Sequence, residues 1–362
     1  MSTSPHNRSP RPAASDAPKP RHPRPLGGDP MKRVDRPLFS LTGMVLNNET
    51  SQLAIKRKPD WLRAKVPGGP GYLRVKAIMD EHRLATVCQE AACPNMGECW
   101  ARGVATIMIL GDTCTRACGF CNVRTGRPVE LDTDEPRRVA ESLKLMSKEA
   151  GIRHIVITSV NRDELPDGGA GIWAETIDRT HVHCPDLSVE VLIPDFLGDV
   201  AAVQTVIDAR PEILNHNLET VRRMYPAVRP QARFDRSLDV LKQCKDAGLV
   251  TKTGIMVGIG ERDEEVLELM DEVQERAQTD ILTIGQYLQP TRNHLPIDRW
   301  VTPETFEWYR EQGLERGFKV VESGPLVRSS YHADKQVDEL VGRERESYQR
   351  VERLIAAAKT SD

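Results

Sequence analysis

The chain has 362 residues, of which 39% are apolar and 28% charged, and its formal net charge is -3. These values are ordinary for a soluble globular protein, so nothing in them points to nucleic acid as the main partner. No stretch approaches the roughly 18 uninterrupted apolar residues of a membrane helix, and the N-terminus lacks the apolar core of a secretory signal. We therefore expect a cytoplasmic protein with no membrane partner.

The first 35 residues differ in composition from the rest of the chain. Eight prolines fall within the first thirty positions, among scattered Arg, Lys and Ser and almost no aliphatic residues. Such a segment cannot bury enough surface to fold, so the sequence predicts a disordered tail over residues 1–35. An organelle transit peptide is the alternative, but the proline density opposes the amphipathic helix that such a peptide needs.

Six of the eight cysteines lie between residues 88 and 121. Eight cysteines are too few for a disulfide scaffold in a chain of this length, and in a reducing compartment such crowding indicates metal binding or catalysis. The six form two groups. The upstream triplet, C-x4-C-x5-C, is Cys88, Cys93 and Cys99, and the downstream triplet, C-x3-C-x2-C, is Cys114, Cys118 and Cys121.

From residue 104 onward, apolar runs rich in β-branched residues alternate with helical periodicity. Strands are predicted at Val104–Leu110, His154–Ser159, Ser188–Ile193, Glu212–Asn215, Lys252–Val257, Ile281–Tyr287 and Lys319–Glu322. A helix capped by Asp134 and ended by Gly151 lies between the first two, and Asp263–Ala277 repeats its pattern. This alternation implies parallel βα units closed into a full or partial TIM-like barrel.

The downstream triplet follows directly after the first predicted strand, and reacting groups of such barrels sit at the carboxyl ends of strands. Three thiolates on one short loop can hold three irons of a [4Fe–4S] cube and leave the fourth iron open. The amine and carboxylate of a substrate can chelate an open iron. A zinc site is the alternative, but it needs a fourth ligand, and none follows at zinc-finger spacing.

The upstream triplet lies in the segment CQEAACPNMGEC, residues 88–99. A second cluster is its most economical explanation. The alternative, three thiols that merely pack, is opposed by the polar and irregular character of the segment. Near the C-terminus, VRSSYHA at 327–333 follows the last predicted strand, but Ser and Arg in a loop are by themselves usually turn or capping residues.

Taken together, these segments resemble the radical S-adenosylmethionine superfamily and, within it, the lipoyl synthase family. The resemblance runs from about Arg57 to Lys335 and includes TSVNRDELPDGGA at 158–170, HNLETV at 216–221, GIMVGIGE at 254–261 and GQYLQPT at 285–291. The paired triplets with RSSY are highly specific. Biotin synthases, the nearest alternative, lack the upstream triplet and RSSY, and a two-cluster electron carrier normally completes each cluster with protein ligands.

The resemblance implies an α/β fold, a partial (β/α)6 TIM-like barrel at residues 104–322, with an N-terminal extension at 36–103 and a C-terminal extension at 323–362. It also implies two [4Fe–4S] clusters. The downstream triplet then ligates the cluster that cleaves S-adenosylmethionine. The auxiliary cluster is ligated by Cys88, Cys93, Cys99 and Ser330, of which the hard serine oxygen is expected to be the weakest ligand.

The implied reaction inserts sulfur at C6 and C8 of an octanoyl chain attached to a lipoyl carrier domain or protein. A 5′-deoxyadenosyl radical made from S-adenosylmethionine removes hydrogen from each carbon, and the auxiliary cluster is the sacrificial sulfur donor. The other expected partners are an electron donor such as ferredoxin or flavodoxin and an iron–sulfur carrier protein.

For S-adenosylmethionine itself, the resemblance points to Asn161, Gly168, Gly169, Glu190 and Asn217. The segment from Asn161 to Gly169 is expected to meet the methionine amino group, and Glu190 and Asn217 the ribose or carboxylate. Two alternatives stay open: the glycine pair is only a turn, and Glu190 is a surface charge. Gly258 and Gly260 are predicted to form a tight turn.

Deleting residues 1–35 should leave the melting temperature and the turnover nearly unchanged, because a segment of this composition adds no packed core. Thermal unfolding and product formation, measured side by side for the truncated and the full-length chain, check this. A large loss of either would show that the tail docks on the folded part or on the substrate.

Overall fold

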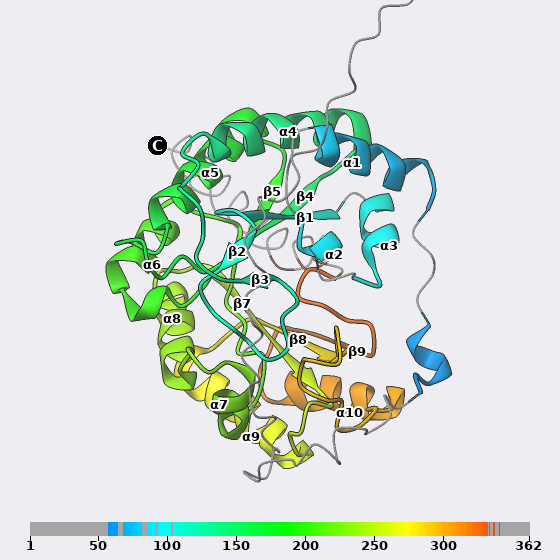
Figure 1. Ribbon diagram of the computed structural model, residues 1–362. Coiled ribbons are helices and arrows are strands. Elements are labelled where there is room, and N and C mark those ends of the chain that lie inside the picture. The colour runs from blue at the N-terminus through cyan, green and yellow to red at the C-terminus, as the bar shows by residue number, and fades with distance from the viewer. Residues whose placement is uncertain are drawn as a thin grey trace, which may run out of the picture. The chain divides into compact units, whose positions relative to one another are not determined.

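Seven parallel strands form one sheet at the centre of the computed structural model (Figure 1). They are β1 (Val104–Ile109), β4 (His154–Ser159), β5 (Ser188–Leu192), β6 (Ile213–Asn215), β7 (Val250–Val257), β8 (Ile281–Gln286) and β9 (Val320–Gly324). Each strand pairs with the next one in this order. Every residue of β1 and β8 is buried, as expected for a parallel sheet that is covered on both faces.

Helices connect the strands and cover the outer face of the sheet, as parallel pairing requires. They are α4 (Glu135–Ala150), α5 (Ala170–His183), α6 (Val200–Asp208), α8 (Phe234–Asp246), α9 (Asp263–Ala277) and α10 (Pro303–Glu315). Each helix packs against the next one in this series. Figure 1 shows them following one another around the sheet.

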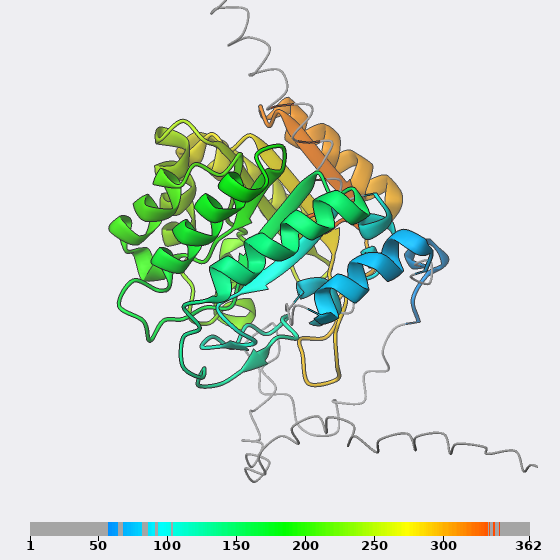
Figure 2. The ribbon, with the colours of Figure 1, turned by 90° about the horizontal axis from the view of Figure 1, so that it is seen from above.

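Three helices precede the sheet, namely α1 (Pro70–Glu81), α2 (Val87–Glu90) and α3 (Met96–Ala101). Helix α1 packs against α3 and α4, and Figure 2 shows it in blue beside the green α4. Tyr72 of α1 stacks on Trp100 of α3 with ring centroids 5.1 Å apart. Aromatic packing thus joins α1 to α3 within the segment before β1.

The remaining elements are short. They are η1 (Asp60–Leu62), β2 (Thr113–Cys114), β3 (Arg124–Thr125), η2 (Phe196–Gly198), η3 (Arg222–Met224) and α7 (Tyr225–Val228).

The structure describes residues 57–63, 68–81, 86–90, 93–102, 104–331, 333, 336 and 340. The predicted tail therefore lies outside the described residues. Among those residues, no helix combines the length and the apolar character that a membrane span requires.

The structure confirms the predicted α/β class and the partial barrel of parallel strands. The sheet has β1 and β9 as its two edges, and these do not pair with each other in the described part of the chain. The barrel is therefore open. Strand β9 is the last of the seven predicted strands, one more than the six of a (β/α)6 arrangement. It runs to Gly324, past the expected end of the barrel at residue 322.

All seven predicted strands are present. The ends of β4 are those predicted, and the other six strands differ from the prediction by one or two residues at one or both ends. Leu110, predicted to end the first strand, has a left-handed backbone (φ 68°), so β1 stops one residue earlier. Strand β7 starts at Val250, two residues before the predicted start. Four other predicted end residues fall just outside their strands: Ile193, Glu212, Tyr287 and Lys319.

Helix α4 begins without the side-chain cap that the sequence predicts. Asp134 has helical backbone angles (φ -90°, ψ -6°), not the extended ones of a typical capping residue, and its side chain caps no backbone N–H. Its carboxylate instead accepts hydrogen bonds from Arg137. The other end agrees with the prediction, because Gly151 takes the left-handed conformation that closes a helix (φ 68°).

The inward faces of α4 and α9 are those that their sequence spacing predicts. Val139, Leu143 and Met146 of α4 are fully buried. The buried residues of α9 include Val266, Leu269, Met270 and Val273. These side chains are apolar and recur at three- and four-residue intervals, so each helix turns one stripe to the sheet.

Replacing Leu143 by Ala should lower the free energy of unfolding by about 2–5 kcal/mol, because the cavity left in a packed core adds to the lost burial. Leu145→Ala is the matched control, since Leu145 lies on the same helix but is only partly buried. Urea unfolding followed by circular dichroism compares the two. Equal losses would contradict the assignment of the inward face.

Candidate functional site

The downstream triplet lies on a loop that begins where β1 ends. Leu110 and Gly111 both have left-handed backbones, with φ of 68° and 94°, so the chain turns sharply here. The Glu135 carboxylate accepts the Leu110 N–H at 2.7 Å and fixes this turn. Strands β2 and β3 then pair with each other, which closes the loop at the carboxyl edge of the sheet.

The three thiols of the downstream triplet lie close enough to influence one another. Burial raises the pKa of Cys118 to about 11 and that of Cys121 to about 12, and neighbouring cysteines of the triplet add to both increases. The backbone N–H groups of Arg116 and Asn161 point at the Cys114 sulfur from 3.4 and 3.3 Å. Such thiols suit a metal cluster, because a bound metal replaces their protons.

The upstream triplet is brought together by two short helices and the turn between them. Cys88 is on α2 and Cys99 on α3, and the Cys93 N–H donates to the Cys88 carbonyl at 2.9 Å. Burial raises the pKa of Cys88 and of Cys99 to about 12, and Cys93 adds to both increases. The structure therefore assembles these three thiols as a second group, separate in sequence from the first.

Neither triplet is arranged like a zinc site. In the described part of the chain, no three His, Cys, Asp or Glu side chains converge as ligands of a single metal ion would. A cube of four irons instead spreads its ligands over separate corners.

The C-terminal residues Gly324–Tyr331, called here the serine segment, return from β9 to the upstream triplet. The Asn95 side-chain N–H donates to the Leu326 carbonyl at 2.5 Å. The Tyr331 hydroxyl donates to the Glu98 carboxylate at 3.4 Å. Burial raises the pKa of Tyr331, and the nearby Glu98 and Cys99 add to this increase. The fold therefore carries Ser330, the residue before Tyr331, to the upstream triplet.

Asn161 and the glycine pair follow β4, and Asn161 and Gly168 border a cavity of about 380 Å³. Gly168 and Gly169 have φ of 61° and 89°, so they do form a turn. A side chain would also be crowded at both positions. An added Cβ atom would lie 2.9 Å from Phe196 at Gly168 and 2.6 Å from Leu110 at Gly169. The cavity is lined by Asn161, Arg162, Asp163, Leu165, Pro166, Asp167, Gly168, Pro194, Phe196, Leu197, Gly198 and Asp199, and its size suits a small ligand.

Glu190 is not the surface charge that one reading of the sequence allowed, because it is completely buried in the sheet. Its carboxylate accepts from Lys252 at 3.0 Å and from the Asn215 amide at 3.3 Å. Burial, the largest single effect, opposes ionisation of this carboxylate, but Lys252 and His154 together outweigh burial and lower the pKa of Glu190. Glu190 is thus engaged inside the sheet.

Asn217 follows β6 and is largely buried. Its side-chain amide donates to the Glu219 carboxylate at 3.0 Å and to the Ser329 hydroxyl at 2.7 Å. Its Oδ1 atom is buried and has no protein partner. Since an unpaired buried acceptor is costly, this atom is a candidate to receive a hydrogen bond from a ligand.

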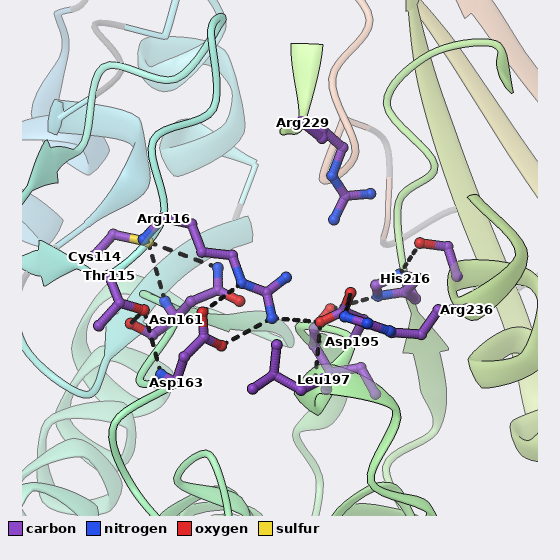
Figure 3. Close-up of polar contacts among 12 residues, drawn as sticks. Cys114, Thr115, Arg116, Asn161, Asp163, Asp195, Leu197, His216, Arg229 and Arg236 are labelled. Carbon is purple, nitrogen blue, oxygen red and sulfur yellow. Dashed lines mark hydrogen bonds and ion pairs between the residues drawn. The ribbon is translucent and has the colours of Figure 1, made fainter. Parts of the chain in front are cut away.

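A buried network of charged side chains lies beside the downstream triplet. It was not predicted from the sequence. Figure 3 shows the Arg116 guanidinium reaching from the cysteine loop toward two carboxylates. It donates twice to Asp163 at 2.8 Å and once to Asp195 at 2.5 Å. Arg236 donates to the other oxygen of Asp195 at 3.2 Å. The signal that could have revealed Asp195 is its position just after a predicted strand.

The ion pairs of this network stabilise the ionised form of Asp195. Burial opposes ionisation of Asp195, yet Arg116 lowers the pKa of this carboxyl to about 2. The side chains of Arg116 and Asp195 are only 2% and 0% exposed. Arg116 therefore ties the cysteine loop to the loops that follow β4 and β5.

The predicted turn at Gly258 and Gly260 is present, with φ of 85° and 130°. The Glu261 carboxylate accepts the backbone N–H groups of Gly258, Ile259 and Gly260 at 2.7, 3.0 and 3.2 Å. These amides form a concave anion site, which the chain fills with its own side chain.

Two family models and several known proteins match the chain. Residues 108–273 match the Radical SAM superfamily, and residues 40–93 match the N-terminal domain of lipoyl synthase of the Radical SAM family. The chain is 58% identical to a lipoyl synthase of Rubrobacter xylanophilus, over 78% of this chain and 87% of that one. It is 54% identical to a lipoyl synthase of Parabacteroides distasonis, over 78% of this chain and 98% of that one. It is 50% identical to a mitochondrial lipoyl synthase of Nematostella vectensis, over 77% of this chain and 95% of that one.

Replacing Arg116 by Ala should lower the free energy of unfolding of the cluster-free chain by about 3–5 kcal/mol, because it strips a buried carboxylate of its main partner. Arg137→Ala is the matched control: Arg137 also bonds two carboxylates, but on the exposed surface, where such pairs contribute little. Anaerobic urea unfolding measures both. Similar midpoints for the two variants would contradict a buried network.

Proposed function

The chain belongs to the lipoyl synthase family, and from that premise we propose which of its residues hold the cofactors and the substrate. As a member of this family it is a radical S-adenosylmethionine enzyme that inserts two sulfur atoms, at C6 and C8, into a protein-bound octanoyl chain. It uses S-adenosylmethionine and two [4Fe–4S] clusters, of which the auxiliary one is the sacrificial sulfur donor. Its protein substrate is an octanoylated carrier.

The downstream triplet is the proposed ligand set of the radical cluster, and the upstream triplet with Ser330 that of the auxiliary cluster. The observation that supports this most directly is that each triplet gathers three free, shielded thiols at its own place in the fold. When bound, the radical cluster supplies the electron that splits S-adenosylmethionine, which yields the hydrogen-abstracting radical, and the auxiliary cluster supplies sulfur.

Ser330 fits the fourth auxiliary position because the serine segment bonds to Asn95 and Glu98, within the upstream triplet. A hard oxygen donor is poorly matched to a cluster otherwise held by soft sulfur. The chain thus offers its weakest ligand on a segment remote in sequence from the three cysteines. That arrangement suits a cluster that must be dismantled in each reaction.

For S-adenosylmethionine we propose the cavity beside the downstream triplet. Asn161 contacts Cys114 through its backbone N–H and lines this cavity together with Gly168, and Gly169 completes the turn. Asn217 offers its unpaired Oδ1 as an acceptor for a ribose hydroxyl or the amino group. Of the five expected residues, Glu190 fits a direct contact least, since Lys252 already engages its carboxylate.

The reaction consumes electrons and cluster sulfur, so both must be supplied again. We propose an electron donor of the ferredoxin or flavodoxin type and an iron–sulfur carrier protein that rebuilds the auxiliary cluster. Free thiols at all eight cysteines favour a reducing compartment, here proposed as the cytoplasm. In domain terms, 36–103 carries the auxiliary cysteines, 104–322 the barrel and 323–362 the RSSY segment.

Two triple variants should separate the proposed roles of the triplets. Replacing Cys114, Cys118 and Cys121 by Ala should leave one cluster and abolish every product, because nothing remains to reduce S-adenosylmethionine. Replacing Cys88, Cys93 and Cys99 should also leave one cluster, yet 5′-deoxyadenosine should still form while the octanoyl chain stays unsulfurated. Iron and sulfide analysis with mass spectrometry of the carrier reads out both.

The wild-type chain, incubated with S-adenosylmethionine, a reductant and an octanoylated carrier domain, is the positive control and should add two sulfur atoms to the carrier. Cys244→Ala is the matched cysteine control, since Cys244 lies buried in α8, away from both triplets. Sulfur insertion by the variant without the upstream triplet would refute the sacrificial-donor assignment. If the wild-type chain added no sulfur to any octanoylated carrier, the function would be refuted.

A further inference from the structure

Asn217 lies where two charged groups beside the downstream triplet meet the serine segment. Its backbone carbonyl accepts from Arg229 at 2.6 Å, and its side-chain amide donates to the Glu219 carboxylate at 3.0 Å. The cysteine loop reaches the same place, because the Gly119 N–H donates to the carbonyl of Val228, the residue before Arg229, at 2.9 Å. Asn217 is therefore joined to the surroundings of the radical cluster.

The same side-chain amide also contacts the serine segment. It donates to the Ser329 hydroxyl at 2.7 Å, a bond between residues 112 positions apart in the chain. Ser329 directly precedes Ser330, the proposed auxiliary ligand. One amide group thus donates to both Glu219 and Ser329, the residue before the proposed auxiliary ligand.

The barrel leaves room for this contact by having glycine at two strand positions. A Cβ atom on Gly285 of β8 would overlap the Val327 carbonyl oxygen and lie 3.1 Å from Arg328 Nη1, and one on Gly254 of β7 would lie 2.9 Å from Asn217 Oδ1. The backbone of the serine segment therefore lies directly on β8 at Gly285, and Asn217 lies directly on β7 at Gly254. Its start is fixed from the other side, where Asn95 bonds Leu326.

Glu219, the partner of the Asn217 amide, is itself held in an unusual conformation. Its φ is 67°, a left-handed value that costs a non-glycine residue energy. Two backbone bonds to β7 maintain it, from the Glu219 N–H to Gly254 at 2.8 Å and from the Met256 N–H to Glu219 at 2.9 Å. The rigid barrel strand thus fixes Glu219, and Glu219 orients the amide.

We propose that Asn217 is a positioning residue that holds Ser329, and through it Ser330, at a fixed place relative to the radical loop. The inference rests on the proposed assignment of Ser330 to the auxiliary cluster. The Asn217 side chain is the direct hydrogen-bond link between the residues beside the downstream triplet and Ser329. Removing it should therefore loosen the auxiliary cluster without removing any of its ligands.

Two measurements on the full chain test this. The first is hydrogen–deuterium exchange, in the cluster-free chain, at the Val327 and Tyr331 amides, which bond Gly324 and Arg328 within the segment. The second is the rate at which a chelator removes iron from the reconstituted holoenzyme. Asn217→Ala and Ser329→Ala should each accelerate both rates about threefold to tenfold, the effect of losing one buried hydrogen bond.

Three further variants make the test specific. The double variant of Asn217 and Ser329 should be no faster than either single one, because both changes break the same bond. Ser329→Thr keeps the hydroxyl and should restore wild-type rates. Ser323→Ala is the matched control and should behave like the wild type, because the Ser323 hydroxyl bonds the Phe306 carbonyl instead.

The outcomes separate this inference from the assignment on which it rests. If Ser330→Ala does not accelerate iron loss, the ligand assignment is wrong, and the exchange rates in the cluster-free chain still decide the role of Asn217. If Ser330→Ala acts but Asn217→Ala and Ser329→Ala leave both rates at the wild-type value, the inference is overturned and the proposed function stands. Additive effects of the two substitutions would also overturn it.

Discussion

Parallel pairing in chain order places the carboxyl ends of all seven strands on the same edge of the sheet, and each group of the site takes its position from that edge. Strand β1 leads to the downstream triplet, β4 to Asn161, β6 to Asn217 and β9 to the serine segment. Residues far apart in sequence can therefore bond directly, as Cys114 and Asn161 do across 47 positions. The barrel stays open between β1 and β9, and the strands at these two edges lead to the two segments that the proposed clusters require.

The same edge concentrates charge in a place with little access to water, and the chain balances that charge by pairing. Arg116 is shared between Asp163 and Asp195, and inside the sheet Lys252 faces Glu190. Such pairs add little net stability compared with apolar packing, but each is costly to break. The two ion pairs of Arg116 join different loops and so fix these loops relative to one another. Their main effect is therefore to position the loops, and their contribution to the free energy of folding is secondary.

The sequence predicted the fold well because the barrel is built from repeated local patterns. Strand runs, the helical spacing of Val139, Leu143 and Met146, and the stop at Gly151 are all set by neighbours in the chain. The cap at Asp134 was wrong because Arg137, one turn on, competes for the same carboxylate. The Arg116–Asp195 pair and the bond from Asn217 to Ser329 were not predicted, since each depends on how distant loops meet. Spacing could propose the cysteines as ligands, whereas only the fold shows that Glu190 is already engaged by Lys252.

A cluster that donates its own sulfur faces two opposed demands, since it must be held until the carbon is attacked and then come apart without unfolding the chain around it. In the proposed assignment, different bonds meet these two demands. Soft thiolates from one short stretch would hold three corners of the cluster. The serine oxygen comes from a segment that is anchored independently, at Leu326 by Asn95 and at Ser329 by Asn217. Breaking the bond between iron and the serine oxygen then frees a ligand but leaves its backbone in place, so the segment keeps the geometry that a rebuilt cluster needs.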